Sequence, residues 1–132
     1  MKRLTKRALE NLRAEAQKLV NEWKPVLGLS DWDVRVQVVP SGEEEAPCWT
    51  VFVWTTREAT ITVRADAFLR GALGWDVNLE QAVIHELLHL LFPMVNQSDT
   101  EDAEYSIFEQ ALNSLAKAFV NLRRASAPSS SA

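Results

Sequence analysis

Residues 82–92, AVIHELLHLLF, place two histidines and a glutamate inside an otherwise apolar run. His85 and His89 are the only histidines of the chain, and Glu86 follows the first of them directly. A buried polar side chain raises the free energy of the folded protein unless it finds a partner, so these three side chains require one. The rest of the sequence must supply that partner.

The segment from Asn78 to residue 92 fits an α-helix that begins at a cap, Asp76 or Asn78, and ends at Pro93. Leucine, isoleucine and valine then cover one broad side, while the two histidines lie about 40° apart on the opposite side, with Glu86 on the same flank. Two imidazoles one turn apart can share one metal ion, with Glu86 beside it. We interpret this HExxH pattern as a zinc site rather than a chance match.

Composition is that of an ordinary globular protein. The chain has 132 residues, is 47% hydrophobic and 24% charged, and has a net charge of -4, which disfavours a broad nucleic-acid-binding surface. Its single cysteine, Cys48, excludes an internal disulfide framework. Neither a secretory signal nor an apolar run of membrane-spanning length is present, so we expect a cytoplasmic protein that does not bind membranes.

The remaining segments predict a helix at residues 4–23, ended by Pro25 and Gly28, and then three strands at 33–39, 48–54 and 58–64. The second and third strands are expected to form a hairpin, with the threonines of the third facing solvent. Residues 65–76 fit either a short helical turn or a loop. A capping box at Ser98 and Glu101 begins a long helix that runs to about Arg124.

This order predicts an α+β domain over residues 1–124, with helices packed on a small, mainly antiparallel three-stranded sheet. The small-residue segment 125–132 is expected to be a disordered tail.

A zinc site needs a third protein ligand, which cannot be a histidine here. The return helix offers Glu104 and Glu109, which border opposite edges of its expected core stripe, and Glu109 alone has a polar companion one turn on, Asn113. Asn113 can accept a hydrogen bond from a ligand histidine, so we favour Glu109, with Glu104 as the alternative. The expected stripe consists of Tyr105, Phe108, Leu112, Leu115 and Phe119.

The sequences HELLH at 85–89 and EQALN at 109–113 resemble the gluzincin metallopeptidases, the thermolysin-like clan, in which HExxH precedes a glutamate ligand in a downstream helix. The chain is much shorter than those enzymes and looks like a minimal single-domain zincin of the phage or prophage type. The resemblance implies a zincin-like fold and a peptide or protein substrate, which would lie extended along an edge strand, for which residues 59–64 are the candidate. It also implies that zinc activates a water molecule and that Glu86 acts as the general base.

Two departures from that family bear on activity. Asn113 stands where the family has an aspartate, so it can orient His85 without adding negative charge. No further histidine remains to stabilise a transition state, and Tyr105, the only tyrosine, is the candidate donor. The sequence therefore predicts a peptidase that is latent or of narrow specificity. The alternatives are a catalytically weak or inactive zinc-stabilised binding or assembly module, and a metal-free helical protein. Oligomeric state has no signature in the sequence.

Overall fold

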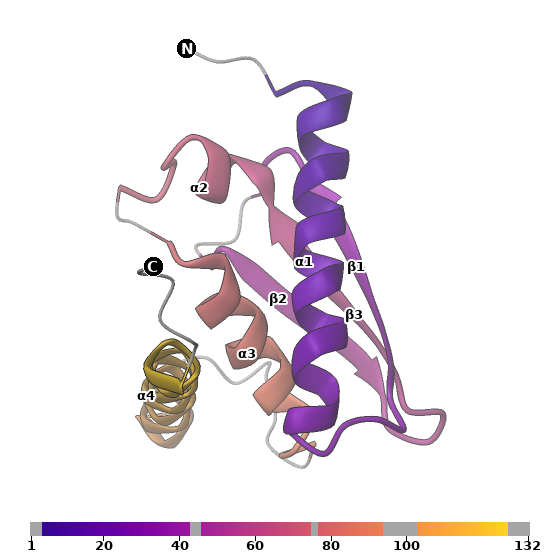
Figure 1. The fold of residues 1–132 in the computed structure, drawn as a ribbon, viewed down its shortest axis with the longest axis vertical. Helices are drawn as coiled ribbons and strands as arrows, with labels where there is room; N and C mark the ends of the chain where they lie inside the picture. The colour runs from indigo at the N-terminus through magenta and orange to yellow at the C-terminus, as the bar shows by residue number, and fades with distance from the viewer. Residues whose placement is uncertain (1–3, 43–45, 75–76, 94–102, 127–132) are drawn as a thin grey trace.

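The computed structural model describes residues 4–42, 46–74, 77–93 and 103–126 (Figure 1). Within these ranges the chain forms the predicted combination of helices and one small sheet, which confirms the α+β class. In chain order the elements are α1 (Lys6–Val26), β1 (Asp33–Val39), β2 (Cys48–Val53), β3 (Glu58–Arg64), α2 (Ala65–Leu69), α3 (Leu79–His89) and α4 (Ala103–Ser126).

The sheet is mixed rather than mainly antiparallel, so that part of the sequence prediction is wrong. Its strand order is β1-β3-β2, with β3 parallel to β1 and antiparallel to β2. The hairpin of β2 and β3 is confirmed, and Thr50 lies opposite Ile61 in it. The alternating valines of β1 indicate a half-buried strand, but that pattern is the same for either direction of pairing, so it did not reveal the neighbour of β1.

The central position of β3 also overturns the choice of residues 59–64 as an edge strand for a substrate. The two edges belong to β1 and β2. At β1 the side chain of Gln17, from α1, donates to the carbonyl of Val34 at 3.1 Å and accepts from the backbone N–H of Val36 at 3.0 Å. Within the described residues, β2 has no strand on its outer side.

One face of the sheet carries the hydrophobic core. Helices α1 and α3 lie side by side over this face, α1 against β1 and α3 against β2 (Figure 1). The core-facing residues of the central strand, Ala59, Ile61 and Val63, are all buried there, as are Ile84 and Leu87 of α3. Burial of the valine, leucine and isoleucine side chains among them stabilises the fold by about 1.5–3 kcal/mol each.

The opposite face of the sheet is partly covered as well. Thr62, expected to face solvent, is buried, and its hydroxyl accepts a hydrogen bond of 2.8 Å from the amide of Gln37 on β1. Gly42 approaches the ring of Trp49 and the stem of Arg64 closely, and a Cβ at that position would lie 3.3 Å from the Trp49 ring. Long neighbouring side chains therefore shield Thr62, which the alternation of polar and apolar residues along the strand assigns to the solvent side.

Helix α1 is shifted at both ends from the prediction of residues 4–23. It begins after Thr5, whose hydroxyl accepts a hydrogen bond of 3.0 Å from the backbone N–H of Ala8. Pro25 lies inside the last turn and does not end the helix. Gly28 follows the helix end with φ at 73°, a left-handed conformation that favours glycine.

The predicted cap of α3 is confirmed, because the side chain of Asn78 accepts from the backbone N–H of Gln81 at 2.9 Å. The capping box at Ser98 and Glu101 lies outside the described residues. Helix α4 continues through Ser126, so the predicted tail begins two residues too early, and its remainder, 127–132, lies outside the described residues.

The core stripe of α4 differs in part from the prediction. Leu112 is buried as expected, and Tyr105, Phe108 and Phe119 are half-buried, but Leu115 is exposed. The buried positions are Leu112, Ala116 and Val120, one turn apart. The prediction followed the large apolar residues, whereas the buried face of α4 also includes Ala116 and Val120, which the predicted stripe left out.

A polar cluster joins the ends of three helices. The guanidinium of Arg123, on α4, donates to Glu80 of α3 and to Glu22 of α1, each at 2.6 Å. Glu80 also accepts a hydrogen bond of 2.9 Å from the indole N–H of Trp23. These contacts hold the C-terminal half of α4 against the start of α3.

None of the helices in the described ranges combines the length and apolar character that a bilayer span requires.

Candidate metal centre

Helix α3 carries the HExxH residues in a buried position. Its residues from Val83 to His89 are all buried, and His85, Glu86 and His89 are only 9%, 6% and 5% exposed. The polar side of this helix therefore faces β2 and α4 rather than solvent. Removing two imidazoles and a carboxylate from water is unfavourable unless they bind one another or a ligand.

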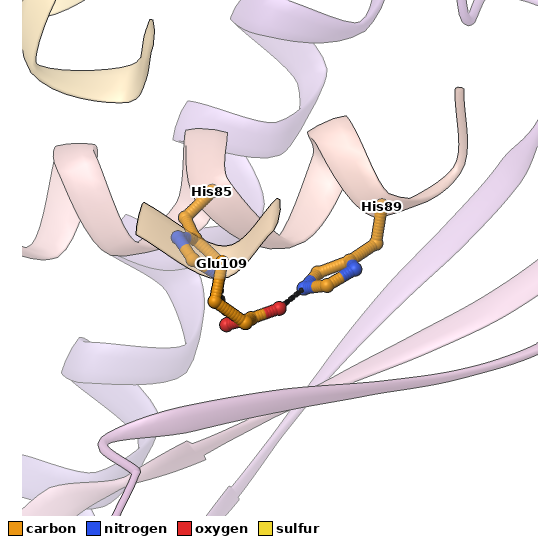
Figure 2. Close-up of side chains that lie close together, drawn as sticks. All are labelled: His85, His89 and Glu109. Carbon is orange, nitrogen blue, oxygen red and sulfur yellow. Dashed lines mark hydrogen bonds and ion pairs between the residues drawn. The ribbon is translucent and has the colours of Figure 1, made fainter. Parts of the chain in front are cut away.

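Helix α4 brings Glu109 to both histidines. Oxygen Oε2 of Glu109 lies 2.9 Å from Nε2 of His85, and Oε1 lies 2.8 Å from Nε2 of His89, as Figure 2 shows. One potential ligand atom from each of the three residues lies within 4.8 Å of the other two. The sequence predicted these three residues as ligands, and the fold brings them to one point.

Asn113 lies one turn beyond Glu109 and contacts the other side of the first imidazole. Its side-chain oxygen is 2.7 Å from Nδ1 of His85. An amide oxygen only accepts, so Nδ1 of His85 carries the donated proton and Nε2 faces Glu109. This arrangement is the one by which an outer oxygen orients a ligand histidine.

One oxygen of the centre lacks a hydrogen bond. Oε1 of Glu109 is buried and has no hydrogen-bond partner among the described residues. The nearby ring nitrogen of His89, Nε2, lies at ion-pair distance from it, 2.8 Å. A buried acceptor in this state is unfavourable, and a cation between Glu109 and the imidazoles would satisfy it.

The charges of the three residues are strongly coupled. Burial alone would lower the pKa of His85, but its hydrogen bond with Glu109 and the charges of Glu86 and Glu109 raise it overall. Burial would raise the pKa of Glu109, but its close contacts with His85 and His89 and the charges of the two rings bring it well below its usual range. The raised pKa of His85 favours a proton there that offsets the charge of Glu109, and a bound cation would take the place of that proton.

Glu86 lies beside this centre and points to the sheet. Its Oε1 accepts a hydrogen bond of 3.0 Å from the hydroxyl of Thr50 on β2. Burial raises the pKa of Glu86, although the positive charges of His85 and His89 and the Thr50 bond act in the opposite direction. A carboxylate with a raised pKa is closer to the range in which a general base works.

Thr50 is a site residue that the sequence analysis missed. The signal was present, because Thr50 alternates with Cys48 and Phe52 on the inner side of a strand, where an apolar residue is expected. A hydroxyl at such a position needs a buried partner, and Glu86 is that partner.

An open cavity of about 900 Å³ lies over the centre, between the first residues of β2 and one side of α4. Its lining includes His85, Glu86, His89 and Glu109, and also Tyr105, the predicted stabilising donor. Burial and the charge of Glu109 raise the pKa of Tyr105, so its hydroxyl stays protonated and able to donate. Glu104 is exposed and does not belong to this lining or to the group of three ligand atoms, so the geometry favours Glu109 over it.

Comparisons of the chain with protein-family models, with curated proteins and with solved structures found no match.

Proposed function

We propose that the chain is a zincin-like, zinc-dependent metallopeptidase of the gluzincin type, with His85, His89 and Glu109 as metal ligands. The observation that carries this proposal is the meeting of these three side chains from two helices, with one potential ligand atom of each within 4.8 Å of the others. Glu86, the residue next to His85, lies beside them. Two imidazoles, one carboxylate and an open cavity make up the typical protein contribution to a catalytic zinc site.

The residues fit the ion on two counts. Oε1 of Glu109 is buried and makes no hydrogen bond with the described residues, and a cation between it and Nε2 of His89, 2.8 Å away, would satisfy it. The Nδ1–H of His85 is held by Asn113, so Nε2 is the nitrogen directed at the centre. A bound zinc ion would lower the pKa of water and polarise a peptide carbonyl.

The chain's own groups would then move the protons. Glu86 would accept the proton of the attacking water and deliver it to the departing amine of the cleaved peptide bond. Tyr105, in the cavity wall and protonated, would donate to the carbonyl oxygen as negative charge develops on it. Asn113 would keep the ring of His85 in place.

The proposed substrate is an extended peptide that binds beside β2. This strand begins at the cavity wall with Cys48, Trp49 and Thr50, and its outer side bears no strand in the described part of the chain. The edge of β1 is bonded to Gln17, and β3 is central. A peptide that added a strand to the sheet at β2 would bring its backbone over the histidines.

A second candidate is a zinc-stabilised binding or assembly module with little or no turnover. The absence of a third histidine from the sequence favours it, because Tyr105 is then the main candidate for transition-state stabilisation. Such a module would keep the metal, the cavity and the extended-peptide site. It would differ from a peptidase only in the missing cleavage step.

Three measurements separate the candidates. Elemental analysis of the full chain, purified without added metal, should find about one zinc ion per chain, and a value near zero would contradict both zinc-based candidates. A diverse peptide library incubated with the zinc-loaded protein should yield cleavage products by mass spectrometry. Glu86→Gln should lower the formation of these products to a small residual rate while zinc content is unchanged, whereas a zinc-loaded wild type that binds peptides and never cleaves them is the binding module.

A further inference from the structure

The carboxylate of Glu86 is fixed from outside its own helix. It is 6% exposed, and its Oε1 accepts the buried 3.0 Å hydrogen bond from Thr50, a residue 36 positions earlier in the chain. The bond joins the edge strand β2 to α3. Glu86 therefore has one oxygen attached to the sheet, and its other oxygen, Oε2, remains for a further contact.

Packing alone does not require a hydroxyl group at position 50. Thr50 is 5% exposed and lies on the core-facing side of β2, between Cys48 and Phe52. Valine has almost the same shape and would fill this position without a polar atom to satisfy. The hydroxyl is therefore best explained by what it bonds.

We propose that Thr50 is a positioning residue that orients the carboxylate of Glu86 for the proton transfers of the proposed peptidase. The inference rests on the proposed function and adds a residue that the HExxH pattern does not contain. With Oε1 held by Thr50, rotation of the carboxylate is restricted, and Glu86 is one of the residues that line the cavity. A general base works only within hydrogen-bond reach of the proton it removes, so this restriction bears directly on rate.

The position of Thr50 also links substrate and base. The strand proposed to bind the peptide, which has no strand on its outer side within the described residues, supplies the hydroxyl that holds Glu86. A peptide aligned on β2 and a carboxylate bonded to β2 would therefore be positioned by the same strand. Alignment of reacting groups in this way accounts for large rate factors in enzymes.

The test compares Thr50→Val, which removes only the hydroxyl, with Thr50→Ser, which keeps it. Both are assayed with a peptide that the zinc-loaded wild type cleaves. Thr50→Val should lower kcat by about 10- to 100-fold, with zinc content unchanged and KM within about twofold, and Thr50→Ser should restore kcat to within about threefold. Equal kcat values for Thr50→Val and wild type, or equal losses for both variants, would overturn the proposal.

Two controls exclude a merely structural effect. Thr62→Val removes a buried hydroxyl from the other face of the sheet, where it is bonded to Gln37, and should leave kcat within about twofold. Thr50→Val in the Glu86→Gln background should cause no further loss of the residual rate, because Thr50 acts through Glu86. A further loss of tenfold or more would show that Thr50 acts in another way.

A crystal structure of each zinc-loaded Thr50 variant gives a readout that needs no activity. The Glu86 carboxylate should leave its position in Thr50→Val and keep it in Thr50→Ser. An unchanged carboxylate in Thr50→Val would overturn the positioning role even in an active enzyme. A wild type that cleaves no peptide would instead reject the peptidase, while the crystal structures would still decide whether Thr50 orients Glu86.

Discussion

His85 and Asn113 are joined through the ring nitrogen that faces away from Glu109, with 2.7 Å between Nδ1 and the amide oxygen. The two residues come from different helices, α3 and α4, and Asn113 lies one turn from Glu109 on the same helix. One helix thus provides both the third candidate ligand and the group that orients the first. Helix α4 is therefore as important to the proposed centre as the HExxH helix itself.

Asn113→Ala should weaken zinc binding by about 10- to 100-fold, because His85 loses the acceptor that fixes its ring and tautomer. Asn113→Asp should strengthen binding, since a carboxylate adds negative charge at the same acceptor position. Competition with a chromophoric zinc chelator measures both changes. The neighbouring cavity residue Gln110 provides the control, and a Gln110→Ala variant that weakened zinc binding as much as Asn113→Ala would contradict the specific role of Asn113.

Glu109→Ala should reduce the zinc content of the purified protein from about one ion per chain to near zero under dialysis against a moderate chelator. The reason is the loss of the only carboxylate among the three ligand atoms that the described residues bring together. Glu104→Ala, a change of the same kind on the same helix, should retain the metal, because Glu104 lies outside the cavity lining. Loss of zinc in Glu104→Ala and its retention in Glu109→Ala would reverse the assignment of the third ligand.

Arg123→Ala should lower the free energy of unfolding by roughly 1 kcal/mol, because two partly exposed ion pairs and their hydrogen bonds are lost. It should also weaken zinc binding, since the contact with Glu80 holds α4 against α3. Urea unfolding and chelator competition measure the two effects. Arg124→Ala, at the adjacent exposed position, should change neither quantity, and an equal effect of both variants would show that net charge rather than the contact is responsible.

Acid should destabilise the fold through Asp66. The guanidinium of Arg64 donates to both carboxylate oxygens, at 3.0 and 2.9 Å, and this pairing holds the pKa of Asp66 below its ordinary value of 3.8. The contribution is therefore fully present above about pH 4 and is lost as the pH falls through the lowered value in the folded state. We expect roughly 1 kcal/mol, measured as the difference in pH dependence of unfolding between wild type and Asp66→Asn. Parallel curves for the two proteins between pH 5 and 2 would contradict this role.

Local patterns predicted most of the elements. The limits of β1 and β3 match the alternating segments 33–39 and 58–64, and the cap at Asn78 is in the predicted place. Each of these features depends on neighbouring residues only. The order of the strands depends on more than neighbouring residues. Parallel and antiparallel pairing give the same alternation along a strand, so only the structure could show that β1 pairs with β3.

The candidate site was predictable to the extent that it lies on helices. Spacing along α3 and α4 brought His85, His89, Glu109 and Asn113 into the prediction, and the structure brings the four together. Thr50 lies on a strand far from them in the sequence, and its contact with Glu86 depends on how α3 packs on the sheet. The prediction that Leu115 faces the core was wrong for a related reason, because the size of a side chain does not show which side of a helix faces its neighbour.

The central place of β3 has a consequence for how the protein is made. Strands β1 and β2 precede β3 in the chain, yet each pairs with β3 and not with the other. While Glu58 and the residues after it are still inside the ribosome, β1 and β2 have therefore been made but β3, the strand with which both pair, has not yet emerged. The hairpin of β2 and β3 is a local pairing, but the parallel pairing of β1 with β3 joins segments about 25 residues apart, such as Asp33 and Glu58. This non-local step slows folding and extends the time for which β1 needs protection from aggregation.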